Sequence, residues 1–344
     1  MSVLIARVAR AVRLVSLIAA STVLLALINP VPAAAHVVGT GGSPTNYRTT
    51  VTAIRPALPT VVATVGLGGQ FVRITNQGAA TIVILGYRGE PFLRLVPHLV
   101  EVNQLSDTAA QTGLIPVAPA PGSPAPEPRW VRSSDGDSVA WTDARIAPPP
   151  RQSQPASESW TLPLLVDGQQ VSVVGTRDWI PSPSPWPWVM VLVLLTAAVA
   201  TIGWMRNWHR PMAAVVTAGI LAFALHVLGT GFAPQQNGPV FGWVGVGLVT
   251  GFALLVGAVS AVSALRGSES APDRAVTAGG IVLILAAADI SVLWNSQLPF
   301  PGPGGLDRGL TVISYAAAIG LIIAGARLVR LARSRRTQVE GTSG

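Results

Sequence analysis

The stretch Trp179–Arg210 has the sequence WIPSPSPWPWVMVLVLLTAAVATIGWMRNWHR, in which a proline-rich half precedes an apolar half. The segment between Trp186 and Met205 contains no charged residue, and an α-helix needs about 20 apolar residues to cross the hydrocarbon core of a bilayer. Prolines before this segment hold the backbone extended, and tryptophans at its two ends suit the headgroup level. Residues 206–210 are basic, as is typical of a cytoplasmic loop. The stretch therefore predicts a membrane span that leaves the first 185 residues outside the cell.

The composition favours a chain with several such spans. Half of the 344 residues are hydrophobic, 11% are charged and the mean hydropathy is +0.51, which is too apolar for a soluble enzyme. The net charge of +8 comes from arginine alone, and the arginines gather near the two ends and in residues 206–210. That distribution fits membrane topology better than a nucleic-acid partner, which we do not expect. The chain has no cysteine, so its outer part has neither disulfides nor thiolate ligands.

The chain divides into five predicted parts. Residues 1–35 resemble an export signal, with arginines, an apolar run and the small residues Ala33 and Ala35 at an A-x-A cleavage site. Cleavage would make His36 the first residue; the alternative is an uncleaved N-terminal anchor. The other parts are an extracytoplasmic β-domain (36–178), a Pro/Trp linker (179–187), a five-helix transmembrane domain (188–333) and a cytoplasmic tail (334–344).

Within the β-domain, short runs of Val, Ile, Thr and aromatic residues alternate with Gly, Pro, Asn and Asp. The predicted strands are Arg48–Ile54, Thr60–Val65, Gln70–Thr75, Thr81–Gly86, Phe92–Val96, Leu99–Asn103, Trp130–Ser133, Ser138–Asp143, Trp160–Val166 and Gln170–Thr176. Asp167 and Gly168 join the last two in a tight hairpin, because both residues tolerate positive φ. So many short strands predict an all-β, immunoglobulin-like sandwich, with the proline-rich Pro116–Pro128 and Pro148–Pro155 as surface loops. The fold class is thus α+β multidomain: a β-sandwich followed by transmembrane helices.

Four further apolar segments are long enough to cross a membrane. They are Met212–Phe232, Val240–Leu265, Ala275–Trp294 and Gly309–Leu331. The loops between the five spans alternate between arginine-rich and nearly neutral, which predicts a multi-pass plasma-membrane protein with a cytoplasmic C-terminus. Small residues spaced four apart, at Gly247 and Gly251 and around Gly320, favour close helix packing.

Polar residues within the predicted spans are the first candidates for a functional site, because such residues are costly in a membrane. His226 lies 14 residues into the second span and Asp289 lies 14 residues into the fourth, about 21 Å from the inner face. Tyr315 enters from the other side and reaches a similar depth. The three residues predict either an outward-facing polar pocket for proton movement or metal contact, or a structural hydrogen bond between helices.

A second candidate is a copper site at the outer face. An N-terminal His36 would offer its amine and its imidazole to Cu(II), and His98 is the remaining histidine of the outer domain. The alternative is that His36 only follows the cleavage site. The four histidines and four methionines form no cluster of the kind seen in copper-handling tracts.

The most distinctive outer stretch is LGYRGEPFLR at Leu85–Arg94, which is followed later by Trp141, Asp143 and Arg145 in AWTDAR. Gly86 and Gly89 permit a sharp bend at Tyr87, and Arg88, Glu90 and Arg94 are predicted to form ion pairs there; a partner-binding edge is the alternative. These motifs resemble a group of uncharacterised actinobacterial membrane proteins that have an exported β-domain and C-terminal spans. Many members of that group have histidines flanking the Asp, where this chain has Thr142 and Ala144. The chain therefore lacks the imidazoles from which a metal site would be built there.

No catalytic motif for a metalloprotease, a serine hydrolase or a P-loop enzyme occurs in the sequence, and Asp135 and Asp137 flank a glycine as in a turn. We therefore expect a protein that is not an enzyme and has no cofactor. The predicted role is binding or assembly: the outer domain meets an envelope protein or small ligand, and the helices anchor it in the lipid bilayer. Metal or proton handling at the candidate sites is the alternative from a different class, and an intramembrane enzyme ranks last.

Overall fold

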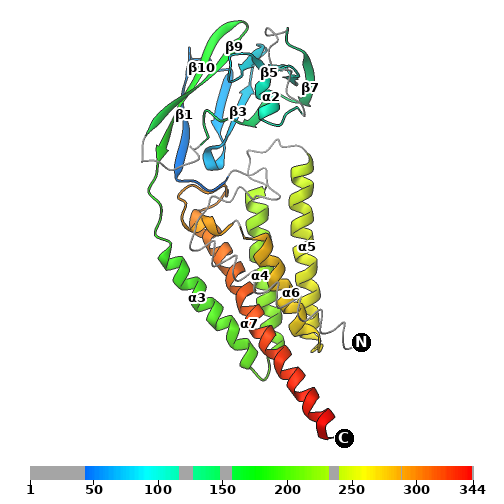
Figure 1. Cartoon of the computed structure of the whole chain (residues 1–344). Coiled ribbons are helices and arrows are strands. Elements are labelled where there is room, and N and C mark those ends of the chain that lie inside the picture. The colour runs from blue at the N-terminus through cyan, green and yellow to red at the C-terminus, as the bar shows by residue number, and fades with distance from the viewer. Residues whose placement is uncertain (1–42, 116–126, 148–156, 232–239, 288, 343–344) are drawn as a thin grey trace.

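The computed structural model describes residues 43–115, 127–147, 157–231, 240–287 and 289–342. A strand-rich part precedes residue 180 and a group of long helices follows it (Figure 1). The two parts lie end to end, so the helices extend away from the β-domain (Figure 1).

The β-domain contains two antiparallel sheets. Its strands are β1 (Tyr47–Arg55), β2 (Val61–Val65), β3 (Phe71–Asn76), β4 (Ile82–Leu85), β5 (Pro91–Val96), β6 (Leu99–Asn103), β7 (Trp130–Asp135), β8 (Ser138–Thr142), β9 (Glu158–Val166) and β10 (Gln169–Trp179). The larger sheet has the order β1-β10-β9-β4-β5-β6-β7, and the smaller has the order β2-β3-β8. Each predicted strand overlaps an observed one. The immunoglobulin-like architecture is not shown, because constant-type domains of that fold divide their strands four and three rather than seven and three.

Alternating apolar residues explain why these strands form two layers. In β9 and β10 the side chains on one face are buried and those between them are more exposed, which is the period-two pattern of a sheet with one face against a core. The core contains residues of both sheets, including Ile74 and Trp141 from the small sheet and Leu164 from the large one. The predicted hairpin is confirmed: Asp167 (φ 48°) and Gly168 (φ 81°) form the turn between β9 and β10.

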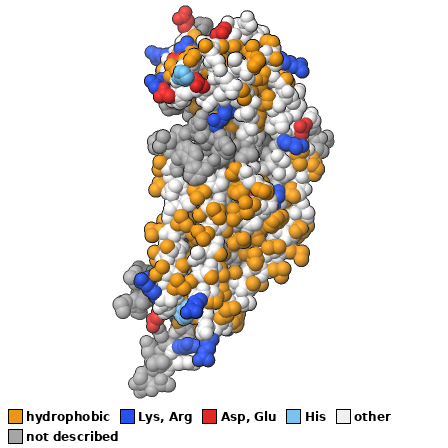
Figure 2. Space-filling model, turned by 180° about the vertical axis from the view of Figure 1, so that it is seen from behind, with side chains coloured by type: hydrophobic (Ala, Val, Ile, Leu, Met, Phe, Trp, Pro, Cys, Tyr) orange, Lys and Arg blue, Asp and Glu red, His pale blue; other side chains and the backbone are white. Residues whose placement is uncertain are grey.

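Within its described residues, the helical part contains four helices that are long and apolar enough to cross a membrane. The elements are α3 (Trp186–Ala200), which continues into the 3-10 turn η2 (Thr201–Trp204), α4 (His209–Gly231), α5 (Val240–Leu265), α6 (Ala271–Leu285), the 3-10 turn η3 (Asp289–Leu293) and α7 (Gly304–Thr342). Figure 2 shows an apolar band over these helices, with arginines gathered at the end far from the β-domain. Exposed apolar surface of this extent marks a membrane-associated protein.

The predicted bundle of five membrane-length helices is not confirmed, because the segment expected to span residues 275–294 is divided. α6 ends at Leu285 and has 15 residues, or about 22 Å, which is shorter than the hydrocarbon core. The chain then turns and forms η3. α7 differs in the other direction: it begins at Gly304 rather than at residue 309 and continues to Thr342, through most of the predicted tail.

Of the small residues predicted to allow close helix packing, Gly320 does so within the part of the chain that the structure describes, but Gly247 and Gly251 do not. A Cβ atom at Gly320 would lie 2.5 Å from Val199 of α3, so this glycine lets α3 and α7 approach closely. Gly247 and Gly251 on α5 do not have this role among the described residues, because a Cβ there would meet no atom within 4 Å.

The β-domain is joined to the helices by hydrogen bonds as well as by the chain itself. Backbone bonds in both directions, of 2.9 and 2.8 Å, connect Thr45 with Gln297 in the segment after η3. The Asn46 side chain accepts from the Ser296 backbone N–H (2.8 Å), and the Ser296 hydroxyl donates to the Ile180 carbonyl (3.2 Å). We name this set of contacts the junction; it brings together three segments that are far apart in the sequence.

Candidate functional site

His226 on α4 lies between two aspartates from other elements. Its Nδ1 atom is 2.6 Å from Oδ1 of Asp307, in the first turn of α7, and its Nε2 atom is 3.4 Å from Oδ2 of Asp289, the first residue of η3. The Asp307 side chain is fully buried, the His226 side chain is 5% exposed and that of Asp289 is 14% exposed. The structure thus brings together His226 and Asp289, as the sequence predicts, and adds Asp307.

Asp307 was missed because residues 295–308 were interpreted as a loop outside the membrane. The structure instead starts α7 at Gly304, and the backbone N–H of Asp307 already donates to the Pro303 carbonyl. A signal existed in the sequence: proline followed by an acidic residue within one turn is typical of a helix start, where a carboxylate is favoured by the helix dipole.

Asp289 reaches His226 from a break in the helix rather than from the middle of a long helix. Side chains of α7 donate hydrogen bonds to backbone carbonyls around this break. The Tyr315 hydroxyl donates to the carbonyl of Ala286, and Arg308 donates to the carbonyls of Val292 (3.1 Å) and Asn295 (2.7 Å). The hydroxyl of the buried Tyr315 thus bonds to the chain just after α6 and not to His226, and its predicted share in a polar pocket stays a prediction.

The geometry around His226 suits a proton-binding group. Carboxylate oxygens only accept hydrogen bonds. A neutral imidazole has one N–H and can donate to only one of the two aspartates, whereas an imidazolium has two and can donate to both. The second oxygen of Asp307, Oδ2, is buried and has no hydrogen-bond partner among the described residues. A buried carboxylate oxygen in that position is costly unless a proton or a small polar group satisfies it.

The three side chains are arranged less well for a metal ion. The two carboxylates face opposite nitrogens of one ring, so their oxygens do not converge on a common point. The described part of the chain holds no group of three His, Cys, Asp or Glu residues with a metal-binding arrangement. Of the predicted copper ligands, His36 lies outside the described residues. His98 sits in the turn between β5 and β6 with its side chain 87% exposed, and its Nδ1 atom is 3.1 Å from Asp137.

The outer-domain motifs, separated by about 50 residues in the sequence, form one network. Asp143 is fully buried and accepts four hydrogen bonds: two from the Arg145 guanidinium, at 2.9 and 2.7 Å, one from the Arg145 backbone N–H at 2.9 Å and one from the Trp141 indole at 3.0 Å. The Arg145 guanidinium also donates to the Leu85 carbonyl (3.1 Å) and lies 5.0 Å from the centre of the Tyr87 ring. Burial raises the pKa of Tyr87 above its ordinary value, despite the hydrogen bond that its oxygen accepts from Ala144. We name this network the outer corner.

Glu90 is held by neutral donors, not by the predicted ion pair. Its carboxylate accepts from the Thr108 hydroxyl (2.7 Å), from the Ser106 hydroxyl (3.0 Å) and from the Arg88 backbone N–H (3.0 Å). Burial alone would raise the pKa of Glu90, but the hydrogen bonds from Thr108 and Arg88 outweigh it and lower that pKa below its ordinary value. Gly86 is required beside this carboxylate, since a Cβ there would lie 2.2 Å from a Glu90 oxygen.

The two arginines of the LGYRGEPFLR motif form ion pairs with residues outside it. Arg88 pairs with Asp107 and Arg94 pairs with Glu101, each at 2.6 Å. Gly89 has φ 79°, which explains the glycine at the tip of the bend. The polar groups of the motif are thus used mainly within the domain, which favours the structural interpretation over a partner-binding edge.

Fold and site together define a membrane-associated protein whose described residues form four apolar helices of membrane length, with an ionisable cluster among the helices and a β-domain at one end. No family model, no curated protein and no solved structure matches the chain.

Proposed function

We propose that this is a multi-pass membrane protein of the binding or assembly class, which presents its β-domain to an envelope protein outside the cell. The observation that carries the proposal is the junction, in which Thr45, Asn46 and Ile180 bond to the segment after η3. A domain tethered only by its linker would be free to reorient, whereas contacts from three segments give it one position relative to the membrane. A fixed position reduces the ordering cost of binding a partner in the same membrane.

The proposed orientation places the β-domain outside the plasma membrane and the C-terminus in the cytoplasm. It is supported by the arginines at the end of the helices far from the β-domain, in residues 206–210 and after Ala326. Cytoplasmic loops carry such an excess of arginine and lysine.

Site-specific photo-crosslinking in intact cells tests the binding role. A photo-reactive residue in place of Arg132, which is exposed on β7, should yield a protein adduct, whereas the same residue in place of the lipid-exposed Leu194 on α3 should not. Asp143→Asn, which disrupts the outer corner, should remove the adduct while the protein stays in the membrane. Absence of adducts at Arg132 and at the exposed Thr64 and Glu158 would contradict the proposal.

A second candidate function, proton handling, is supported by the buried Oδ2 atom of Asp307, which has no partner among the described residues. In this proposal His226, Asp289 and Asp307 share a proton whose gain or loss changes the charge at the base of the β-domain. Asp289 begins η3, which is followed three residues later by Ser296 of the junction. A change of charge at the cluster could therefore shift the junction and the β-domain bonded to it.

Infrared spectroscopy of the full-length protein tests the second candidate directly. Neutral and protonated imidazole rings absorb at different frequencies, so spectra recorded as a function of pH should show a histidine band that His226→Gln removes. Asp273→Asn, at the start of α6 and outside the cluster, is the matched control and should leave the band unchanged. A pH-dependent histidine spectrum that His226→Gln leaves unchanged would contradict proton exchange at this cluster.

A further inference from the structure

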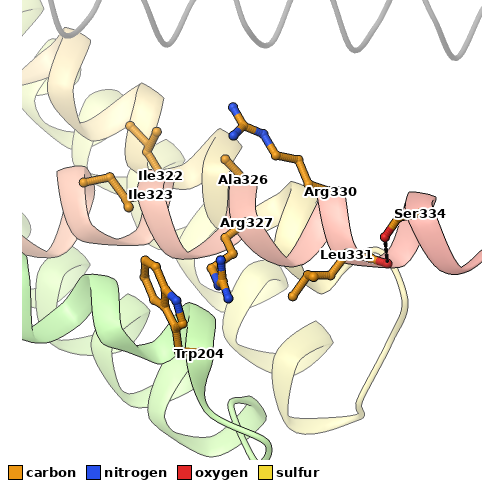
Figure 3. A pocket seen from close by; sticks show the side chains of 8 residues that line it. All are labelled: Trp204, Ile322, Ile323, Ala326, Arg327, Arg330, Leu331 and Ser334. Carbon is orange, nitrogen blue, oxygen red and sulfur yellow. Dashed lines mark hydrogen bonds between the residues drawn. The ribbon is translucent and has the colours of Figure 1, made fainter.

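A groove lies at the end of the helices far from the β-domain. It is bounded by η2 on one side and by α7 on the other, and its volume is about 580 Å³ (Figure 3). This volume is within the range of small-ligand sites. The residues that α7 contributes, including Ile323, Arg327, Arg330 and Ser334, are spaced by four, three and four positions and therefore share one face of the helix.

One wall of the groove is cationic. The guanidinium of Arg327 lies 4.2 Å from the centre of the Trp204 ring, a cation–π contact that fixes its position. Its Nε atom is buried and has no hydrogen-bond partner among the described residues. Arg330 follows one turn later and is exposed, and no acidic side chain is among the residues that line the groove. The groove thus has two guanidinium groups, one of them with a buried Nε donor that has no hydrogen-bond partner among the described residues, and no carboxylate lines it.

The same side of the groove also has apolar side chains, which suit an acyl chain. Ile322, Ile323 and Leu331 of α7 line it beside the two arginines, and the Ile323 side chain is 42% exposed. The groove also lies where α7 changes from mostly apolar to arginine-rich. Before Arg327 its residues are mainly apolar, and from Arg327 onward arginines recur, at 327, 330, 333, 335 and 336. Trp204 is 60% exposed at the same level, as is typical of the membrane–water interface.

The close approach of η2 to α7 gives the groove a fixed shape. A Cβ atom at Gly203 would lie 3.0 Å from the backbone of Ala324 and 3.3 Å from the side chain of Arg327, so glycine allows η2 and α7 to pack closely here. Trp204, the next residue, is thereby held against Arg327.

We propose that this groove binds an anionic phospholipid, with the lipid phosphate between Arg327 and Arg330 and an acyl chain against Ile322 and Ile323. Arginine matches the geometry of phosphate oxygens, and basic pockets between helices recognise anionic headgroups in this way. The adjoining apolar side chains favour a lipid over a free phosphate ion, which would leave those side chains in water. The proposal depends on the helices lying in a bilayer and is independent of what the β-domain binds.

Native mass spectrometry of the detergent-solubilised full-length protein, titrated with phosphatidylglycerol, tests the proposal. Arg330→Ala should weaken binding about fivefold and the double change Arg327→Ala/Arg330→Ala about 25-fold, as expected for one phosphate contact per arginine. Arg330 is exposed, so its replacement leaves the packing of α3 against α7 intact even if Arg327→Ala disturbs it. Arg335→Ala, on the same helix but outside the groove, is the control and should change the affinity less than twofold.

Three results would overturn the proposal. Equal loss of affinity in Arg335→Ala would show attraction by general charge, and equal binding of phosphatidylcholine would show that the groove does not recognise an anionic headgroup. Glycerol phosphate, the headgroup without acyl chains, should fail to compete at the concentration at which the lipid saturates the protein. Full competition would instead show a site for free anions.

Discussion

At the scale of single residues, Asp143 and Glu90 show how the outer domain uses its carboxylates. Asp143 is fully buried and accepts two hydrogen bonds from one guanidinium, and Glu90 accepts from hydroxyl and backbone donors. Buried carboxylates are tolerated only when such partners are present. Replacing either residue should therefore lower the stability of the whole β-domain.

Gly86→Ala is expected to destabilise the β-domain by about 1–3 kcal/mol, because the new methyl group would displace the Glu90 carboxylate from its hydrogen bonds. Hydrogen exchange of β-domain amides in the full-length protein measures this loss. In a Glu90→Ala background the same substitution should cost less, since one of the atoms it collides with is gone. An equal cost in both backgrounds would contradict this explanation.

The lowered pKa of Glu90 predicts an acid-dependent loss of β-domain stability. A carboxyl group with a lower pKa in the folded state stabilises that state fully above its unfolded value of about 4.3. The stabilisation is lost as the pH falls from there through the folded pKa. Glu90→Gln, which does not titrate, should flatten this part of the pH profile of hydrogen exchange near Thr108. An unchanged profile in Glu90→Gln would show that other groups cause the acid dependence.

The sequence singled out residues that lie together in the structure, but it did not predict their partners. The motif residues Tyr87 and Arg145 were both singled out, but their contact joins segments 58 positions apart and no local pattern encodes it. Asp307 was missed for a local reason, since the boundary of α7 was placed too late and so assigned this residue to a loop. Helix boundaries are set by hydrogen bonds that a hydropathy window does not detect.

At the scale of elements, the division of the fourth predicted span into α6 and η3 is the largest departure from the sequence-based prediction. Hydropathy could not show it, because residues 275–294 are apolar enough throughout except at Asp289. The break is stabilised by α7, because Arg308 and Tyr315 donate hydrogen bonds to backbone carbonyls on either side of it. The ten strands, by contrast, were predicted because they are rich in Val, Ile, Thr and aromatic residues and are bounded by turn residues.

Arg308→Ala should open η3. The carbonyls of Val292 and Asn295 would lose a charged donor, and each such hydrogen bond is worth about 1.5–3 kcal/mol. Hydrogen exchange of the amides in Asp289–Gln297 should accelerate, whereas Arg274→Ala on α6 should leave them unchanged. Unaltered exchange in Arg308→Ala would show that η3 does not depend on this arginine.

At the scale of the whole molecule, the junction decides whether the two parts move as one. Asn46→Ala removes the acceptor for the Ser296 N–H and the donor to the Ser182 hydroxyl, so the β-domain should gain freedom relative to the helices. Because the chain has no cysteine, spin labels on introduced cysteines at Arg132 and Leu306 report this motion directly. Their distance distribution should broaden in Asn46→Ala but not in Thr64→Ala, an exposed change on β2. Equal widths in all three proteins would contradict the role of the junction.

The orientation of the chain in the membrane is the central claim, because the proposed role of the β-domain requires that domain to be outside. Single cysteines at Arg132 in the β-domain and Arg335 near the C-terminus can be tested in intact cells with a membrane-impermeant maleimide. The proposed orientation predicts labelling at position 132 before permeabilisation and at position 335 only after it. Labelling of position 335 in intact cells, with position 132 protected, would contradict this orientation.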